Sequence, residues 1–362
     1  MRILHLLNDV REIGNGIINM AVDLACTQAE SNHTVGVASS GGDYETLLSR
    51  YGIKHFTLNQ TRTPANLVKA VHSYQAIAKE FQPDIVHAHM MTGVILVKFF
   101  RGHASYSLVS TVHNEFQRSA ILMGLADGVI AVSQAVATSM QQRGIPAQKL
   151  HVVLNGTLGS PRNRSLPESQ SLPLQRPAIL TVAGMYQRKG IGELIDAFCK
   201  IAPSFPSVHL YLVGNGPDKS IFEAQACASS VADRIHFEGF QPEPMRYLHS
   251  SDIFVLASRQ EPFGLVLAEA REAGCAIVAS NVDGIPEALD QGEAGILVPP
   301  CDSQALADAL AQLLQAPEQL NNWRQRSQKN LEWLSVHRVC QQTLAVYEKV
   351  IQEKRNGECR NF

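Results

Sequence analysis

Residues 259–274 read R-Q-E-P-F-G-L-V-L-A-E-A-R-E-A-G, and this stretch is the clearest indication of the fold class. An apolar run with β-branched residues, 252–257, precedes it and has the length of a buried strand. Good helix formers follow Gly264, and Gly274 ends their run. The pattern predicts a strand, a tight loop and a helix. In an open α/β sheet, ligands bind at such a junction, beyond the carboxyl end of the strand.

Two glutamates bracket this loop, Glu261 before the helix and Glu269 inside it, with seven residues between them. At a rise of about 1.5 Å per residue, both can reach the helix N-terminus. The amides near Phe263, Gly264 and Leu265 point toward the same place, which suits a phosphate. The spacing alone also fits a capping glutamate followed by a solvated one, so it does not identify a site.

The block E-P-F-G-L-V-L-A-E resembles the E-x7-E signature of retaining glycosyltransferases of family 4, which have the GT-B fold. Two downstream blocks, G-I-P-E at 284–287 and G-E-A-G-I-L-V-P at 292–299, resemble the same family. The resemblance is strong across 178–300 and thinner, though continuous, across the first half. It implies an α/β protein whose two doubly wound Rossmann-like domains face an inter-domain cleft.

Composition sets broad limits on the protein. A chain of 362 residues predicts roughly two domains, and a formal charge of −2 gives no indication of nucleic acid binding. Seven cysteines, scattered singly, favour reduced thiols and argue against a zinc site. No apolar run approaches the roughly 18 residues needed to span a bilayer, and the N-terminus leads straight into a strand pattern. We therefore expect a soluble, cytoplasmic protein.

Apolar runs alternate with helical patterns in both halves, which predicts a parallel, doubly wound sheet in each. Strands are expected at 3–7, 34–38, 53–58, 85–89, 107–112, 128–132, 178–183, 208–213, 235–238, 252–257, 276–279 and 296–298. A proline- and serine-rich stretch without periodicity separates the halves and indicates a linker. We therefore divide the chain into a first domain (1–156), a linker (157–177) and a second domain (178–334), and the resemblance implies that the first domain binds the acceptor and the second the nucleotide sugar. The resemblance implies that a last helix, 335–352, packs back on the first domain.

Further residues resemble the donor site of the family. Gly14 and Gly16 lie in a loop after the first strand, which is equally compatible with a plain turn; the resemblance implies that it approaches the donor phosphates. The resemblance also implies that Lys189 contacts the diphosphate, with Arg188 beside it. The family commonly has an arginine where this chain has Met185. Whether Arg188 replaces that arginine stays open.

The resemblance also assigns the sugar and the base. It implies that Glu261 orients the hexose hydroxyls as a catalytic residue and that Glu269 binds the ribose. His113 resembles a family histidine beside the donor sugar and is the second catalytic candidate. The resemblance implies that the base contacts the backbone around Phe240 and Gln241, together with Gly214.

Three histidines, His87, His89 and His113, fall at the ends of predicted strands. For His87 a structural role at the strand end is the default, whereas His89 is interpreted as facing the acceptor. An H-x-H pair without a carboxylate partner argues against a metal site. No D-x-D motif occurs either. We therefore expect no metal cofactor, with the positive charge coming from Lys189, Arg188 and the helix N-terminus.

Residues 93–103 are apolar and include Lys98 and Arg101. Such a stretch can contact a membrane surface, but a buried crossover helix explains it more simply because the apolar residues run nearly all round.

The resemblance implies a retaining transfer of a hexose from a nucleoside-diphosphate sugar to a glycan, lipid or small-molecule acceptor, and the absent D-x-D motif predicts that this transfer is metal-independent. A UDP-sugar is favoured over a GDP-sugar, and the inner face of the plasma membrane is an alternative location to the bulk cytoplasm. Two other functions stay open: a nucleotide-sugar epimerase of the same fold, and a sugar-nucleotide-binding subunit without catalysis.

Overall fold

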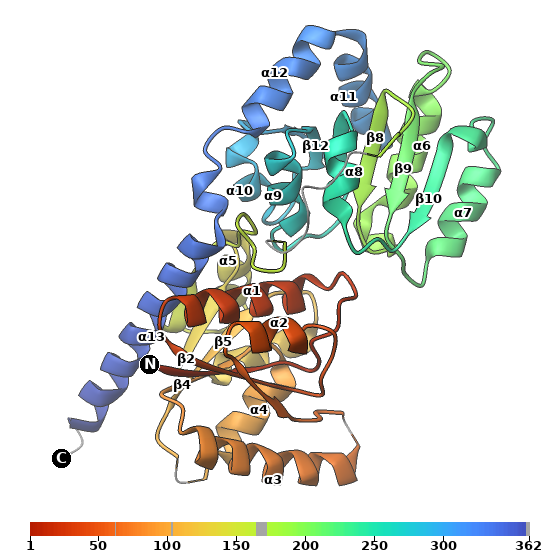
Figure 1. The fold of residues 1–362 in the computed structure, drawn as a ribbon. Helices are drawn as coiled ribbons and strands as arrows, with labels where there is room; N and C mark the ends of the chain where they lie inside the picture. The colour runs from red at the N-terminus through yellow and green to blue at the C-terminus, as the bar shows by residue number, and fades with distance from the viewer. Residues whose placement is uncertain (62, 103, 164–171, 360–362) are drawn as a thin grey trace. The chain divides into compact units, whose positions relative to one another are not determined.

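The structure is a computed structural model that describes residues 1–61, 63–102, 104–163 and 172–359. The chain divides into two compact units: unit 1 is Met1–Ser165 with Leu334–Phe362, and unit 2 is Leu166–Trp333. Each unit has a parallel β-sheet with helices on its faces (Figure 1). The prediction of two doubly wound α/β domains is therefore confirmed.

The sheet of unit 1 has the strand order β3-β2-β1-β4-β5-β6-β7, and all its pairs are parallel. Its strands are β1 (Arg2–Leu6), β2 (Thr34–Ser39), β3 (Lys54–Thr57), β4 (Ile85–Ala88), β5 (Ser107–Val112), β6 (Gly128–Ala131) and β7 (Leu150–Val152). Six of these coincide with predicted strands to within about two residues at each end. The sequence did not predict β7, because three residues are too few to show a period and pairing with β6 is what defines this strand.

The helices of unit 1 cover both faces of this sheet, with α1 and α2 on one face and α3 and α4 on the other (Figure 1). Asn15 begins α1, because its side-chain oxygen accepts a hydrogen bond of 3.0 Å from the amide of Ile17. The helices are α1 (Gly16–Glu30), α2 (Glu45–Arg50), α3 (Pro64–Phe81), α4 (Met91–Phe100), α5 (Gln134–Gln142) and α13 (Val336–Cys359), with 3-10 turns η1 (Arg118–Leu125) and η2 (Ala147–Lys149).

Helix α4 is the crossover between β4 and β5 that the apolar stretch 93–103 predicted, although residue 103 lies outside the described residues. Val94 and Val97 are fully buried, whereas Phe99 and Phe100 at the end of the helix are exposed. In the described part of the chain, no helix combines the length and the apolar character needed to cross a membrane.

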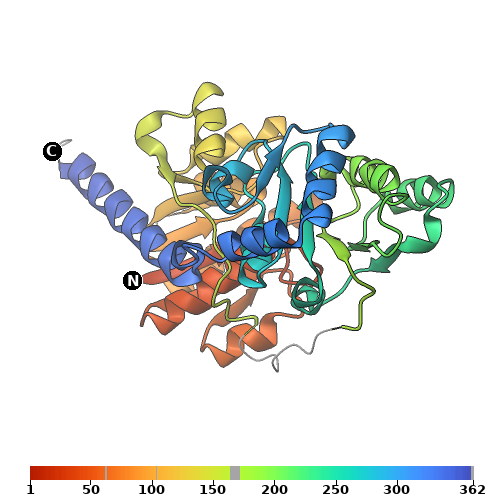
Figure 2. The same ribbon diagram turned by 90° about the horizontal axis from the view of Figure 1, so that it is seen from above.

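The last helix, α13, belongs to unit 1 although the chain reaches it through unit 2. It is one uninterrupted helix (Figure 2) and packs against α1, β5 and β6. Tyr347 on this helix is fully buried. Its hydroxyl lies 2.6 Å from Nδ1 of His87 and 3.3 Å from Nε2 of Gln28. The helix therefore contributes part of the polar core of unit 1.

The sheet of unit 2 has the strand order β10-β9-β8-β11-β12-β13, again all parallel. The strands are β8 (Ala178–Val182), β9 (His209–Val213), β10 (Ile235–Gly239), β11 (Ile253–Leu256), β12 (Ala276–Ser280) and β13 (Ile296–Val298). All six coincide with predicted strands. The central residues of β8, β9, β11 and β12 are almost fully buried, which explains why these four strands read as continuous apolar runs rather than alternating ones.

Helix α6 packs against α7 and α11, and α9 packs against α8 and α12. The helices are α6 (Ile191–Ile201), α7 (Lys219–Cys227), α8 (Pro244–Ser250), α9 (Leu265–Glu272), α10 (Ile285–Ala288), α11 (Ser303–Gln315) and α12 (Pro317–Ser327), with 3-10 turns η3 (Gln187–Lys189), η4 (Ala232–Arg234), η5 (Asp290–Gly292) and η6 (Glu332–Leu334). Helix α9 follows β11 as the stretch 252–274 predicted.

The expected linker, 157–177, is bound to unit 1 at its start. Ser160 donates a hydrogen bond of 2.7 Å to the buried carboxylate of Asp23, and Arg162 pairs with the same carboxylate at 2.9 Å. Single polar contacts of this kind leave no periodic pattern in the sequence, so the composition of the stretch did not reveal them. Residues 164–171 lie outside the described residues.

Candidate functional site

The strand order of unit 2 reverses between β8 and β11. From β8 the chain adds β9 and β10 on one side of the sheet, and it then returns to place β11 on the other side of β8. In open α/β sheets the crevice beyond the carboxyl ends of two such strands is where ligands bind. The loop after β8 carries Lys189, and the loop after β11 carries Glu261.

Lys189 and Glu261 form an ion pair between Nζ and Oε2, although 72 residues separate them in sequence. Their side chains are only 15% and 10% exposed. Ser258, at the end of β11, donates a hydrogen bond of 3.1 Å to the same Oε2. The predicted phosphate-binding lysine and the predicted sugar-binding glutamate therefore meet at the switch point of unit 2. Ser258 was not predicted, because a single serine after a strand carries no signal.

Gly190 allows the two loops to approach. It has a φ of +67°, and a Cβ at this position would lie 1.8 Å from the carbonyl oxygen of Ala257. Any other residue would push the loop of Lys189 away from the end of β11. The glycine in R-K-G is thus required by the geometry that brings Lys189 to Glu261.

The backbone of Glu261 is held by the loop after β12. Its amide donates to Oδ2 of Asp283 at 2.9 Å, and its carbonyl accepts from the amide of Gly284 at 3.1 Å. Burial raises the pKa of the Asp283 carboxyl; the bond from the Glu261 amide opposes this rise, and the Glu261 charge adds to it. The loops after β8, β11 and β12 therefore fix Glu261 from three sides. The sequence did not predict Asp283, which precedes the G-I-P-E block.

Helix α9 begins directly after this glutamate. Gly264 is its N-cap with a φ of +86°, and the amide of Leu267 bonds back to the Gly264 carbonyl at 2.9 Å. Among the described residues, no acceptor binds the amides of Phe263, Gly264 or Leu265. Glu269 is half-buried on the second turn. The N-terminus of α9 thus offers unused donors next to the Lys189–Glu261 pair.

Met185 lies in the hydrophobic core of unit 2 and is fully buried, so this position cannot reach a phosphate. Arg188 is half-buried, with its guanidinium 5.7 Å from the ring centroid of Tyr186. Its carbonyl accepts from the amide of Arg259 at 2.8 Å, which joins the loop after β8 to the loop after β11. The Arg259 side chain is itself paired with Glu193 at 2.6 Å. Arg188, unlike Arg259, has no carboxylate partner among the described residues.

The three residues predicted to contact the base lie at the carboxyl ends of β9 and β10. The amide of Gly214 donates to the Gly239 carbonyl at 2.7 Å and joins these ends. Gly214 has a φ of +137°, and a Cβ would lie 1.9 Å from the carbonyl oxygen of Ala183, so glycine is required here. Phe240 is 41% exposed, and Gln241 donates from Nε2 to the Glu238 carbonyl at 2.8 Å. These residues therefore lie at the same edge of the sheet as Lys189.

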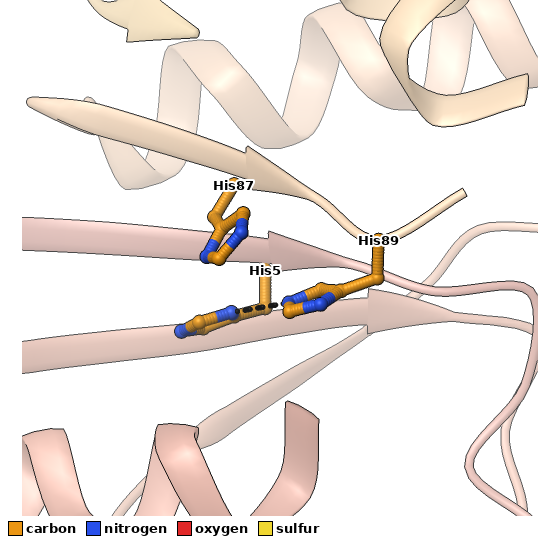
Figure 3. Close-up of side chains that lie close together, drawn as sticks. All are labelled: His5, His87 and His89. Carbon is orange, nitrogen blue, oxygen red and sulfur yellow. Dashed lines mark hydrogen bonds between the residues drawn. The ribbon is translucent and has the colours of Figure 1, made fainter. Parts of the chain in front are cut away.

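In unit 1 the strand order reverses between β1 and β4, and four histidines gather on these strands and just after β4 and β5. Nδ1 of His5 lies 2.9 Å from Nε2 of His89, and Nδ1 of His89 lies 3.1 Å from Nε2 of His113 (Figure 3 shows the first of these bonds). His87 instead bonds to Thr111 and Tyr347. Burial is the main cause that lowers the pKa of His5 to about 4 and that of His113 to about 4.

His5 was missed at the sequence level. It is one polar residue within an apolar run, and it pairs in register with His87 on β4. The doubly wound order that places β1 beside β4 was the signal that could have found it. Gly14 precedes Asn15, the N-cap of α1, and Gly16 is the first residue of that helix.

Nitrogen atoms of His5, His87 and His89 lie within 4.8 Å of one another, a spacing that could hold a metal ion. Both ring nitrogens of each residue, however, already have a hydrogen-bond partner within the protein. A metal ion would have to displace those bonds, and no carboxylate lies among the three ligands. The hydrogen-bonded arrangement accounts for the cluster without an ion.

Two protein-family models match consecutive parts of the chain. Residues 14–157 match the model described as Glycosyltransferase Family 4, and residues 163–330 match the model of glycosyl transferases group 1. The second match contains the Lys189–Glu261 pair and helix α9.

Curated proteins resemble parts of the chain. N-acetyl-alpha-D-glucosaminyl L-malate synthase of Bacillus anthracis is 29% identical over 181 residues, which are 50% of this chain and 47% of that protein. Alpha-maltose-1-phosphate synthase of Mycolicibacterium smegmatis is 29% identical over 296 residues, which are 74% of this chain and 73% of that protein. The chain thus matches about half the length of the first relative and about three quarters of the second.

The fold also resembles solved structures. The crystal structure of Alr3699/HepE from Anabaena in complex with UDP superposes with a TM-score of 0.80 at 22% identity, covering 96% of this chain and 100% of that one. At this identity the likeness shows the fold alone. With both family models, two doubly wound units and glycosyltransferases among its relatives, the chain belongs to the family 4 glycosyltransferases of the GT-B fold.

Proposed function

We propose that the protein is a retaining glycosyltransferase that moves a hexose from a nucleoside-diphosphate sugar to a glycan, lipid or small-molecule acceptor, without a metal ion. The observation that carries the proposal is the pair of Lys189 and Glu261 at the switch point of unit 2, beside the unused amides of α9. Solved structures of the similar HepE contain UDP and UDP-glucose, which supports a UDP-sugar as the donor.

The transferred sugar leaves behind a nucleoside diphosphate, so the site must stabilise negative charge that develops on phosphate oxygens. Lys189 and the amides at the start of α9 would supply that stabilisation, with Arg188 available from the same turn. Glu269, one helical turn farther on, would accept hydrogen bonds from the ribose hydroxyls. These groups supply the charge that a divalent cation provides in other transferases, and this supports metal independence.

Glu261 would act on the sugar. In the structure its Oε2 accepts from both Lys189 and Ser258, which fixes the carboxylate before any ligand is bound. When a diphosphate binds Lys189, the lysine would lie between two anions and its bond to Glu261 would weaken. The carboxylate would then accept hydrogen bonds from hexose hydroxyls. The ion pair therefore couples diphosphate binding to orientation of the sugar.

Membrane contact has less support. Phe99 and Phe100 are exposed at the end of α4, but Lys98 and Arg101 lie 3.7 and 3.8 Å from the carboxylate of Asp127. That carboxylate offsets the charge that would attract an anionic lipid surface. We therefore propose action in the cytoplasm and do not include membrane binding in the function.

The proposed function is tested by incubating the protein with UDP- and GDP-sugars and a panel of acceptors in excess chelator. We expect acceptor-dependent release of the nucleoside diphosphate, and NMR of the product should show the anomeric configuration of the donor. An inverted anomer would exclude a retaining enzyme. Activity lost in chelator and restored by magnesium or manganese would contradict metal independence. An epimerised sugar formed without acceptor would indicate the epimerase, and nucleotide binding without turnover would indicate the non-catalytic subunit.

The two glutamates should separate binding from turnover. Glu269→Ala is expected to weaken nucleotide affinity by about 10- to 100-fold, since a charge-assisted hydrogen bond contributes about 1.5–3 kcal/mol. Glu261→Ala should keep or slightly raise affinity for the free nucleoside diphosphate, because it frees Lys189, and it should depress turnover. Calorimetry and initial rates measure both effects, with the exposed Glu272→Ala on α9 as the control. Weaker nucleotide binding by Glu261→Ala than by Glu269→Ala would reverse the roles.

A further inference from the structure

A continuous row of side-chain hydrogen bonds crosses unit 1 from α1 to the end of β5. Oε1 of Gln28 lies 2.8 Å from Nε2 of His5. The row continues from Nδ1 of His5 to Nε2 of His89 at 2.9 Å, and from Nδ1 of His89 to Nε2 of His113 at 3.1 Å. His5 and His89 are drawn with this bond in Figure 3. Gln28, His5 and His89 are all buried, and His113 is half-buried at the open end.

Burial keeps these rings neutral at neutral pH. It lowers the pKa of His5 to about 4, that of His89 well below the usual value, and that of His113 to about 4. A neutral imidazole has one N–H donor and one acceptor nitrogen. Each ring in the row therefore donates to one neighbour and accepts from the other, so all the hydrogen bonds of the row run in the same direction. The group at the buried end of the row, on α1, sets this direction and with it the tautomer of every ring.

Gln28 is that group. Its amide nitrogen faces the Tyr347 hydroxyl at 3.3 Å, so its oxygen faces His5 and accepts from Nε2–H. Nδ1 of His5 must then accept from Nε2–H of His89. Nδ1 of His89 in turn accepts from Nε2–H of His113. His113 is left with an unprotonated Nδ1.

Nδ1 of His113 has no hydrogen-bond partner among the described residues. It is not one of the fully buried side-chain atoms without a partner, so it is accessible to solvent. We propose that Gln28, His5 and His89 are positioning residues that hold His113 in its Nε2–H tautomer and present Nδ1 as an acceptor for a substrate hydroxyl group. The assignment of that hydroxyl to the transferred hexose rests on the proposed function. The tautomer itself does not.

The tautomers can be observed directly. Protein labelled with 15N-histidine is examined by long-range 1H–15N correlation spectra at pH 7, assigned by single His→Gln variants. We expect His5, His89 and His113 all to be protonated at Nε2. Gln28→Met keeps the length of the side chain but removes the acceptor and donor, and it should give His113 a mixture of tautomers. Thr111→Val is the matched control, since it removes a buried partner of His87 alone and should leave the row unchanged.

Activity provides the second measurement. Gln28→Met should lower kcat by about tenfold or more with little change in KM for the donor nucleotide, whereas Thr111→Val should keep the parent value. An Nδ1–H tautomer of His113 in the parent protein would overturn the proposal. So would a stoichiometric metal retained on dialysis, or a shift of tautomer in Gln28→Met without loss of turnover. If Gln28→Met does not fold, the parent spectrum still decides the tautomer. If no acceptor supports transfer, the proposed function fails while the spectrum still tests the row.

Discussion

Replacing Lys189 with alanine is expected to weaken binding of a nucleoside diphosphate by about 10- to 100-fold and to leave the monophosphate nearly unaffected. A lost charge-assisted hydrogen bond accounts for about 1.5–3 kcal/mol. The structure adds a second cause, because the side chain of Glu261 is only 10% exposed and would remain next to the phosphate without its lysine. Calorimetry with both nucleotides measures the difference.

A double variant separates the two causes, which are the lost bond to the phosphate and the unpaired carboxylate of Glu261. Adding Glu261→Gln to Lys189→Ala removes the uncompensated carboxylate and should recover part of the lost affinity. Arg188→Ala should weaken diphosphate binding only if Arg188 takes the place of the arginine that Met185 cannot supply. Lys200→Ala is the control. This lysine lies in the last turn of α6 and donates a hydrogen bond of 3.0 Å to Oγ of Ser303. Equal diphosphate affinity in Lys189→Ala and the parent protein would exclude this phosphate site.

Unit 1 is expected to lose stability steeply as the pH falls from about 6.5 toward about 4. Burial lowers the pKa of His5 and His113 to about 4, and those of His87 and His89 well below the usual value, whereas the unfolded chain titrates near 6.5. In this interval the unfolded state binds more protons, so the free energy of unfolding falls by about 1.4 kcal/mol per pH unit for each histidine. Above pH 6.5 these groups contribute no slope.

Denaturant unfolding at pH 7, 6 and 5 measures this slope, and hydrogen exchange of the β1 and β4 amides assigns it to unit 1. His87→Gln should reduce the slope by about one histidine's share. His72→Gln, at an exposed position on α3, should leave it unchanged. A free energy of unfolding that stays level between pH 7 and pH 5 would show that the cluster is not held neutral.

The sequence predicted the fold well where local patterns determine it. Buried parallel strands read as apolar runs because both faces are covered, and twelve of them were found in the correct halves. The site was predicted only as separate motifs. Lys189 and Glu261 were each identified, but their contact depends on the adjacency of β8 and β11 and on the close approach that Gly190 permits.

Other parts of the site had no local signal. Ser258 and Asp283 act through single hydrogen bonds to Glu261, and residue type alone does not distinguish them from ordinary loop residues. The histidine row needs β1, β4 and β5 in their final order, together with Gln28 from α1. Such residues could be predicted only after the strand order was known.

Helix α13 completes unit 1 from the far end of the chain, and this has a consequence for synthesis on the ribosome. Translation delivers the seven strands of unit 1 first, then all of unit 2, and only afterwards Tyr347. Until then the hydroxyl that bonds to Gln28 and His87 is missing from a nascent unit 1, while unit 2 is already whole. The part of the protein that emerges first is therefore the last to be finished, and the orientation of Gln28 is set in that final stage.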